Sequence, residues 1–318
     1  MLFPPENCPR IVVKIGSALL VDAAGGVRRA WLEGIAADIA ERVAAGQQVA
    51  VVSSGAIALG ARRLNLPKGG RASLEDAQAA AATGQIALGH TWAEVLAARG
   101  LTAAQILVTL DDLEDRRRYL NAAATLGRLL QLGVVPIINE NDSVATAEIR
   151  FGDNDRLAAR VAQAAGAQGV VLLSDIDGLY DRNPALPGAV HIARVERIDA
   201  GVAAMADTGS ASGMGSGGMV SKIQAARIAT GAGAALAIAS GRIERPLSTA
   251  ARHTIFVPEK RKRARKAWLA GRLTAKGATA CASSAEVAKH ADIIITMVPD
   301  TPHVEEALFG KGGVAEGL

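Results

Sequence analysis

The 318-residue sequence has few aromatic side chains, few cysteines and no long uninterrupted apolar run. Phe, Trp and Tyr together make up 3% of the residues, which argues against a binding surface of stacked rings, as in many single-strand nucleic-acid binders. The two cysteines, Cys8 and Cys281, form neither a CxxC motif nor a disulfide framework, so we expect a reducing, cytoplasmic location. No run of about eighteen apolar residues predicts a transmembrane helix. Residues Met1–Arg10, with three prolines and an acid, are not typical of a signal peptide.

Small side chains carry much of the apolar content, and the chain holds 34 glycines. Half of the residues are hydrophobic and 21% are charged, which excludes a disordered or collagen-like chain and provides for a large buried core. The length predicts about two domains. The net charge of +4 mildly favours anionic ligands but is too small to indicate nucleic acid as a partner.

Short apolar runs alternate with longer stretches rich in Ala and Leu. The runs predict buried strands at Ile11–Ile15, Val49–Val52, Ile106–Val108, Val134–Ile138, Val170–Leu173 and Ala234–Ala239. The longer stretches predict helices at Trp31–Ala45, Leu74–Ala98, Tyr119–Leu132, Arg156–Ala165 and Met219–Thr230. This alternation predicts an α/β fold in which helices cover both faces of a mostly parallel sheet, a three-layer αβα sandwich.

Small polar residues follow four of the predicted strands. The segments are Gly16-Ser17, Ser53-Ser54-Gly55, Asn139-Glu140-Asn141-Asp142 and Ser174-Asp175. Because ligands bind beyond the carboxyl ends of strands in open α/β sheets, these segments outline one shared site. Taken singly, each is also typical of an ordinary turn.

A glycine-rich stretch, Ser210–Met219, leads into a predicted helix that contains Lys222. The backbone N–H groups of such a loop, and of the helix N-terminus, can hold phosphate oxygens. A flexible linker is the alternative. A dinucleotide fingerprint is not favoured, because no acid lies between Asp207 and Glu244, and no Walker P-loop is present.

Three further features have two interpretations each. Lys14, within an apolar strand pattern, is either buried beside an anion or on an edge strand facing water. The polar residues from Asn139 to Asp155 either bind a ligand or serve as turns and caps, with Asp153 or Asn154 capping the next helix. The basic run Glu259–Lys266 is either a solvated helix face, which we favour, or a contact for nucleic acid. The five histidines are scattered, which argues against a histidine metal site.

Together these segments resemble the glutamate 5-kinases, of the amino-acid kinase superfamily, over about residues 8–270. The matching segments are Val13–Ser17, Ser53–Ile57, Asn139–Ile149, Phe151–Asp155, Leu173–Asp175, Gly178–Tyr180 and Gly215–Lys222. The first and last are shared across the superfamily. Asn139–Asp142 and Gly152–Asp155 single out the glutamate enzymes.

The resemblance implies the amino-acid kinase fold and transfer of the ATP γ-phosphoryl group to the side-chain carboxylate of L-glutamate, the first step of proline biosynthesis. It implies that Lys14 and Lys222 flank the transferred group, that Asp155 holds both lysines, and that Ser54, Asp142 and Asn154 bind glutamate. The residues implied to hold the nucleotide, with Mg²⁺ on its phosphates, are Lys14, Ser174, Asp175, Ser216, Gly217, Gly218, Met219, Val220, Ser221 and Lys222.

The same resemblance implies feedback inhibition by proline and assembly into a homo-oligomer. No metal ligand from the protein itself is expected. Neither nucleic acid nor a membrane is expected as a partner.

After about Gly277 the chain departs from this family. Many bacterial glutamate 5-kinases continue into a PUA domain, which is not recognised in residues 277–318. These residues instead resemble an internal fragment of the β-hydroxyacid dehydrogenases, the family that includes tartronate semialdehyde reductases. We therefore expect an amino-acid kinase domain at 1–270 and, at 271–318, an atypical tail that resembles a partial Rossmann segment. No dehydrogenase activity is expected, because that family's glycine fingerprint and catalytic lysine are missing.

Three functions are weighed. The first is a glutamate kinase, with aspartate, N-acetylglutamate or carbamate as alternative acceptors on the same fold. The second is an oxidoreductase, motivated by the tail and by Gly213–Gly218. The third is a catalytically disabled ligand-binding chimera.

Overall fold

A computed structural model of the protein describes residues 1–22, 25–144, 154–207, 218–258, 279, 281, 283–296 and 301–317. The chain divides into two compact units, Met1–Ala264 and Arg265–Leu318. The division expected between residues 270 and 271 falls within residues 259–278, outside the described residues, and stays a prediction. The basic run Glu259–Lys266 lies there too.

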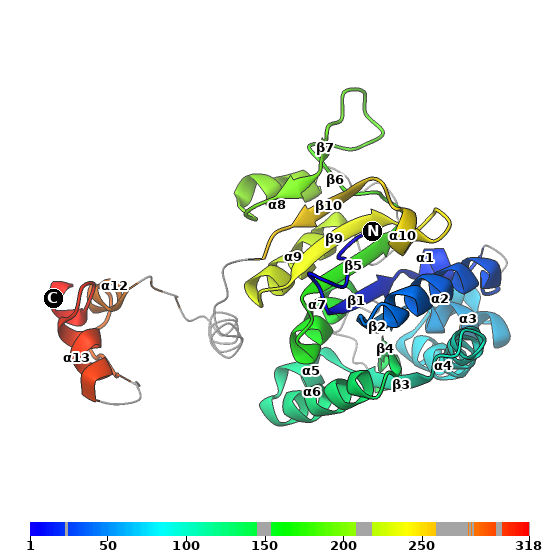
Figure 1. Cartoon of the computed structure of the whole chain (residues 1–318), viewed down its shortest axis with the longest axis horizontal. Helices are drawn as coiled ribbons and strands as arrows, with labels where there is room; N and C mark the ends of the chain where they lie inside the picture. The colour runs from blue at the N-terminus through cyan, green and yellow to red at the C-terminus, as the bar shows by residue number, and fades with distance from the viewer. Residues whose placement is uncertain are drawn as a thin grey trace. The chain divides into compact units, whose positions relative to one another are not determined.

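One eight-stranded sheet forms the centre of the first unit (Figure 1), in the order β3-β4-β2-β1-β5-β9-β10-β8. Its strands are β1 (Arg10–Ile15), β2 (Gln48–Ser53), β3 (Ala103–Val108), β4 (Val135–Glu140), β5 (Gly169–Ser174), β8 (Arg194–Val195), β9 (Ala235–Ser240) and β10 (His253–Phe256). Pairing is parallel from β3 to β9, and β10 runs antiparallel to β9. The six strands expected from the apolar runs are present as β1 to β5 and β9. The short strands were not anticipated, and they include a separate antiparallel pair, β6 (Leu179–Tyr180) and β7 (His191–Ile192).

Helices cover both faces of this sheet, as predicted. Those of the first unit are α1 (Ser17–Leu20), α2 (Arg29–Ala44), α3 (Ala56–Arg63), α4 (Leu74–Ala97), α5 (Leu110–Glu114), α6 (Arg116–Gln131), α7 (Asn154–Ala165), α8 (Ala200–Asp207), α9 (Met219–Gly231) and α10 (Pro246–Thr249), with the 3₁₀ turns η1 (Pro67–Gly70) and η2 (Asp142–Val144). The buried side chains of α5 to α9 form one apolar cluster. Those of α1 and α2 form another with part of α3 and α4, and the remaining buried side chains of α3 and α4 form a third between these two helices.

The strands divide between the first two of these clusters by alternation. Val12 of β1 belongs to the cluster beneath α5 to α9, whereas Ile11 and Val13 belong to the one beneath α1 to α4. Successive side chains of a strand point to opposite faces, so β1 is covered on both sides. The three-layer αβα sandwich is therefore confirmed.

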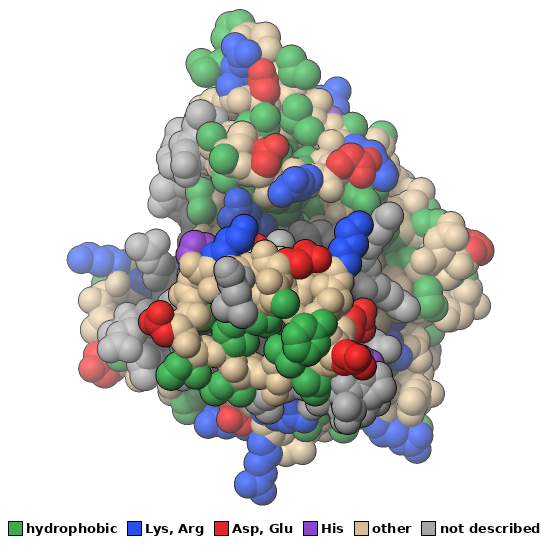
Figure 2. Space-filling view, turned by 90° about the vertical axis from the view of Figure 1, so that its left-hand side faces the viewer, with side chains coloured by type: hydrophobic (Ala, Val, Ile, Leu, Met, Phe, Trp, Pro, Cys, Tyr) green, Lys and Arg blue, Asp and Glu red, His purple; other side chains and the backbone are tan. Residues whose placement is uncertain are grey.

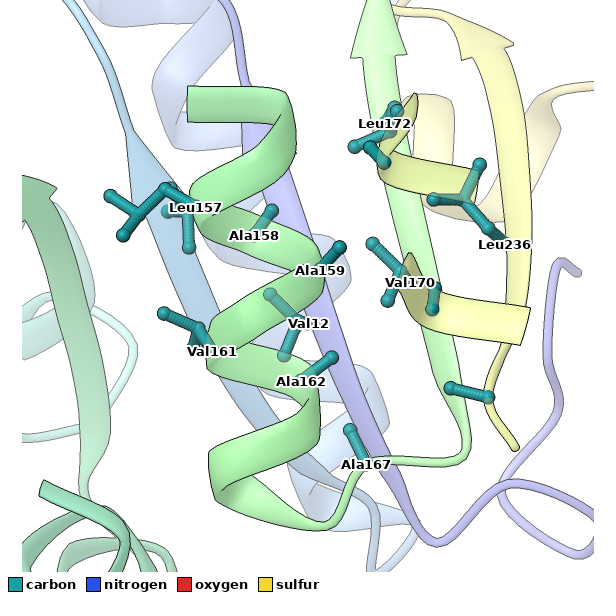
Figure 3. Close-up of a cluster of buried hydrophobic side chains, with 14 of the residues drawn as sticks. Val12, Leu157, Ala158, Ala159, Val161, Ala162, Ala167, Val170, Leu172 and Leu236 are labelled. Carbon is teal, nitrogen blue, oxygen red and sulfur yellow. The ribbon is translucent and has the colours of Figure 1, made fainter. Parts of the chain in front are cut away.

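Helix α7 lies close on the sheet because its inner face is built of small side chains. Ala158, Ala159 and Ala162 face Val12 of β1, and Leu157 and Val161 complete the contact (Figure 3). All of these side chains are 1% exposed or less. Alanine keeps the helix axis near the strands, so the first residues of α7 lie at the carboxyl ends of the strands.

Helices α3 and α4 cross with their backbones in contact. A Cβ atom on Gly60 would lie 1.8 Å from the carbonyl oxygen of Ala80, and one on Gly84 would lie 1.8 Å from that of Ala56. Such distances are far inside van der Waals contact, so only glycine fits at these two positions. This crossing sets the start of α3, and hence the segment Ser53–Gly55 before it, against the middle of α4.

The second unit contains the short helices α12 (Ser284–Ala288) and α13 (Thr301–Phe309) and the 3₁₀ turn η3 (Val314–Glu316). The resemblance to the β-hydroxyacid dehydrogenases implies an interior strand at residues 293–298. Residues 293–296 are not in a strand here, and residues 297–298 lie outside the described part. Ile293 and Ile295 are 82% and 81% exposed. The described residues of this unit therefore include no sheet with which the apolar segment at 293–296 could pair.

Candidate active site

Two lysines from distant parts of the chain meet at one buried carboxylate. Lys14 Nζ, near the end of β1, lies 2.7 Å from Asp155 Oδ1, and Lys222 Nζ on α9 lies 2.9 Å from Asp155 Oδ2. Lys14 is 7% exposed, Lys222 is 5% exposed and Asp155 is 1% exposed. The interpretation of Lys14 as an edge-strand lysine is excluded, because β1 pairs with β2 on one side and β5 on the other.

The electrostatics of this cluster keep its carboxylate ionised. Burial alone would raise the pKa of the Asp155 carboxyl, but the two ammonium groups outweigh it and hold that pKa below its usual value. The group is thus ionised at neutral pH. One carboxylate between two ammonium groups forms a compact unit of net charge +1 that suits an anion with more than one negative charge.

A chain of side-chain amides lies beside this cluster. Asn154, the first residue of α7, donates from Nδ2 to Ser54 Oγ at 2.6 Å and to Asn139 Oδ1 at 3.1 Å. Asn139 Nδ2 donates to Gln85 Oε1 at 2.8 Å. The Asn154 side chain therefore links β4 to the turn after β2. The alternative role considered for this residue was that of a helix cap. Asp153 lies outside the described residues.

Asp142 lies in η2, just after β4, and is 7% exposed. Burial raises the pKa of its carboxyl to about 6, against a smaller opposing effect of Arg71. It lines a pocket of about 170 Å³ together with Gln85, Glu140 and Ser143. Asp142 Oδ1 and Asn154 Oδ1 are both buried and have no hydrogen-bond partner among the described residues. Two open acceptors of this kind suit a ligand that donates hydrogen bonds.

Apart from Lys14, the residues predicted to hold a nucleotide lie at the end of β5 and around the start of α9. Ser174 ends β5 and donates to Asp175 Oδ1 at 3.0 Å, while Asp175 Oδ2 lies 3.9 Å from Arg242. Helix α9 begins at Met219, and its N-cap residue Gly218 has no side chain to cap it. A helix N-terminus is a ready phosphate-binding element. Ser216 and Gly217 lie outside the described residues, and Val220 and Ser221 belong to the first turn of α9.

The structure brings together Lys14, Asp155 and Lys222 in one cluster and Ser54 and Asn154 in another. The ligands assigned to each predicted residue stay predictions. Gln85 was not predicted from the sequence as part of the site. A glutamine on an otherwise apolar, alanine-rich face of a predicted helix was the feature that could have indicated it.

No metal-binding group of three or more His, Cys, Asp or Glu side chains occurs in the part of the chain that the structure describes. None of the described helices is long and apolar enough to cross a membrane. Among the described side chains on the face shown in Figure 2, Lys and Arg are interspersed with Asp and Glu.

The fold and the lysine cluster define a class: an α/β protein with a buried site, at the carboxyl edge of a parallel sheet, in which two lysines share one carboxylate. The chain belongs to the amino acid kinase family, whose model matches residues 9–240. It is 83% identical over 276 residues to a glutamate 5-kinase of Sphingopyxis alaskensis, covering 87% of this chain and 75% of the relative. It is 63% identical over 321 residues to a glutamate 5-kinase of Zymomonas mobilis, covering 100% and 80%.

Solved structures share the fold at lower identity. Carbamate kinase from Giardia lamblia bound to AMP-PNP superposes with a TM-score of 0.56 at 15% identity, covering 79% of this chain and 99% of that one. UMP kinase from Ureaplasma parvum gives a TM-score of 0.52 at 18% identity, covering 78% and 98%. These likenesses confirm the predicted fold.

A second family matches the end of the chain. The NAD binding domain of 6-phosphogluconate dehydrogenase matches residues 248–318, which confirms the predicted resemblance to a dehydrogenase fragment. The match starts earlier than expected and includes β10, a strand of the kinase sheet. The junction of the two resemblances therefore lies inside the first compact unit.

Proposed function

We propose that this chain is an ATP-dependent kinase that phosphorylates the side-chain carboxylate of L-glutamate to give L-glutamyl 5-phosphate, the first step of proline biosynthesis. The observation that carries the proposal is the pair of buried ammonium groups of Lys14 and Lys222 on the single carboxylate of Asp155. The kinship with glutamate 5-kinases supports the choice of substrate.

The reaction joins two anions, so repulsion between them is the main obstacle. A glutamate side-chain carboxylate is already ionised near pH 7, with a reference pKa of about 4.3, and needs no general base. One of its oxygens attacks the γ-phosphorus, the new O–P bond forms, and the bond to the leaving ADP oxygen breaks; no proton is transferred. Lys14 and Lys222 offset the charge that both reactants bring, and positioning supplies much of the remaining acceleration.

The nucleotide site is proposed between the end of β5 and the start of α9. Gly218, at the N-cap of α9, has no side chain to cap the helix, and the N-terminus of a helix suits phosphate oxygens. No carboxylate trio is described that would hold a metal ion by itself, so Mg²⁺ is proposed to arrive on the nucleotide. When bound there, it neutralises part of the phosphate charge.

The acceptor site is proposed at Ser54, Asn154 and Asp142. The α-ammonium group of an amino acid donates hydrogen bonds, and the unpartnered Oδ1 atoms of Asn154 and Asp142 are acceptors. An ionised Asp142 adds a countercharge to this ammonium group. Carbamate has no such group, and N-acetylglutamate has replaced it with a neutral amide, so both fit this pattern less well than free glutamate.

An acceptor panel tests the proposal directly. ADP release is measured with ATP, Mg²⁺ and, in turn, L-glutamate, L-aspartate, N-acetyl-L-glutamate and carbamate. We expect turnover with L-glutamate and at least tenfold lower kcat/KM with the others. Faster turnover of carbamate or N-acetyl-L-glutamate would reassign the substrate, and ATP binding without ADP release would support a disabled chimera.

Further properties are proposed on kinship alone. They are inhibition by proline, assembly into a homo-oligomer and a cytoplasmic location, with no nucleic-acid partner. Glutamate-dependent ADP release with added proline and light scattering of the full chain test the first two.

The dehydrogenase-like end of the chain is proposed to have no oxidoreductase activity, although its family match gives a reason to test it. Titration of the full chain with NADH and NADPH should leave the nicotinamide fluorescence unchanged. A saturable change would contradict this proposal.

A further inference from the structure

We propose that Gln85 on helix α4 is a positioning residue for the acceptor site, which it serves by fixing the side-chain orientation of Asn139 and, through it, that of Asn154. The inference rests on the proposed function, because it assigns to Asn154 a contact with the amino-acid substrate. Gln85 itself is not proposed to touch the substrate.

The argument begins with the direction of the hydrogen bonds. An asparagine side chain has a donor end and an acceptor end. Gln85 Oε1 accepts from Asn139 Nδ2 at 2.8 Å, so Asn139 presents its Oδ1 to Asn154 Nδ2 at 3.1 Å. Because Asn154 Nδ2 is engaged by Asn139 and by Ser54 Oγ, its Oδ1 is the free end. One acceptor on α4 thus determines which atom of Asn154 is offered to a ligand.

The surroundings hold Gln85 in place. Gln85 is 7% exposed, while Asn139 and Asn154 are each 2% exposed, so water does not compete freely for these amides. Gly84, the neighbour of Gln85, makes the backbone contact with Ala56 at the start of α3. The same helix crossing therefore fixes Gln85 at one end of the chain of amides and the Ser54 turn at the other.

A purely structural role accounts poorly for a glutamine at this position. Its Nε2 is buried without a hydrogen-bond partner among the described residues, which costs stability that an apolar side chain would not. Leucine or methionine would fill similar space on the apolar inner face of α4. Retaining the amide is consistent with a use for its Oε1 in orienting Asn139.

Removing this acceptor should weaken glutamate binding and leave the nucleotide side unchanged. Without Gln85 Oε1, the side-chain amide of Asn139 can rotate and exchange its donor and acceptor ends. Asn154 then presents either its Nδ2 or its Oδ1 to the substrate, without preference. We expect Gln85→Leu to raise KM for L-glutamate about three- to tenfold, with KM for ATP unchanged and kcat within about twofold. Gln85→Met serves the same purpose should the leucine variant fold poorly. Gln85→Glu, which keeps an acceptor at this position, should restore most of the glutamate affinity.

The matched control is Gln131→Leu at the end of α6, the same chemical change in a residue that neither lines this pocket nor takes part in the chain of amides. It should keep the wild-type KM for L-glutamate. In an Asn154→Ala background, Gln85→Leu should cause no further rise in that KM, because its effect passes through Asn154.

Two results would overturn the inference. One is an unchanged glutamate KM in folded Gln85→Leu or Gln85→Met, with folding checked by thermal unfolding. The other is an equal rise in glutamate KM in the wild-type and Asn154→Ala backgrounds. An absence of glutamate-dependent turnover in the wild-type chain would instead refute the proposed function, so the two failures are distinguishable.

Discussion

Lys14 and Lys222 share one carboxylate: their Nζ atoms lie 2.7 and 2.9 Å from the two oxygens of Asp155. The two ammonium groups would repel each other in a buried site without this countercharge. Asp155 therefore makes it possible to bring two positive charges together away from bulk water. In the proposed reaction, the two ammonium groups offset the negative charge of the triphosphate and of the acceptor.

Replacing either lysine should slow turnover. We expect Lys14→Ala and Lys222→Ala each to lower kcat more than tenfold, at least about 1.4 kcal/mol in activation free energy, because each ammonium group offsets charge in the transition state. Glutamate-dependent ADP release at saturating ATP measures this. Lys289→Ala, an exposed lysine, is the control. Near-normal turnover of either active-site variant would refute its assigned role.

Removing the shared carboxylate should affect both stability and activity. Asp155→Asn leaves two buried ammonium groups without their countercharge, which typically costs about 3–5 kcal/mol for a buried pair. We expect a lower unfolding temperature and a more than tenfold loss of kcat. Because the pKa of Asp155 is lowered by folding, its stabilising contribution is present above its ordinary pKa of 3.8 and is lost as the pH falls through the lower folded value. Thermal unfolding measured downward from pH 7 should show this loss in the wild type and a flatter profile in Asp155→Asn.

The Asp142 carboxyl should make glutamate binding depend on pH near 6. Its pKa is raised from 3.8 to about 6 by burial, so it becomes protonated below that pH and no longer offers a charge to the substrate ammonium group. We expect KM for glutamate to rise as the pH falls through 6. Asp142→Asn should have a higher KM throughout and no such dependence, and a persisting rise in this variant would assign the titration to another group.

The same raised pKa predicts a stability change of opposite sign to that of Asp155. Folding favours the neutral Asp142 carboxyl, so its contribution is most favourable at low pH and is lost as the pH rises from about 4 to about 6. At pH 8, the free energy of unfolding of Asp142→Asn should therefore exceed that of the wild type by on the order of 2 kcal/mol. The variant should accordingly unfold at a higher temperature. Equal unfolding temperatures at pH 8 would contradict this expectation.

The crossing of α3 and α4 should not accept a methyl group. Gly84→Ala and Gly60→Ala each place a Cβ atom 1.8 Å from a backbone carbonyl oxygen, and forcing the helices apart should cost about 1–3 kcal/mol or more. Gly127→Ala on α6 is the matched control, because a Cβ there meets no neighbouring atom; it should stabilise the protein by about 0.5–1 kcal/mol through helix propensity. Denaturant unfolding of the three variants measures the contrast. Equal effects at all three positions would show that the crossing is not tight.

Removal of the tail should leave the proposed kinase reaction in place. Lys14, Asp155 and Lys222 all lie in the unit Met1–Ala264, so truncation after Lys276 removes no residue of the cluster. We expect an unchanged kcat and equal or better solubility, because the exposed Ile293 and Ile295 are removed. Complete loss of activity would show that the tail is integral to the enzyme.

Periodicity and residue type were sufficient for the main strands and helices, since strands buried on both faces of a parallel sheet are continuous short apolar runs. They were insufficient for β8 and β10, which are too short to show a repeating pattern of apolar and polar residues. They also left Lys14 with two interpretations. The neighbours of β1 decided between them, because a strand flanked by β2 and β5 has no free edge and its lysine needs an anionic partner.

Local pattern thus determined the α/β class, the turns that follow four strands and the family to which the motifs belong, because these properties depend on residues close together in the chain. The pairing of Asp155 with Lys14 and Lys222 was implied by the family resemblance, because nothing near Asp155 in the sequence points to either lysine. The contact of Gln85 with Asn139 came only from the folded chain. These contacts exist because the strand order, the packing of α7 on the sheet and the crossing of α4 with α3 bring remote segments within hydrogen-bond distance. Such distances are set by packing in three dimensions and not by neighbours in the sequence.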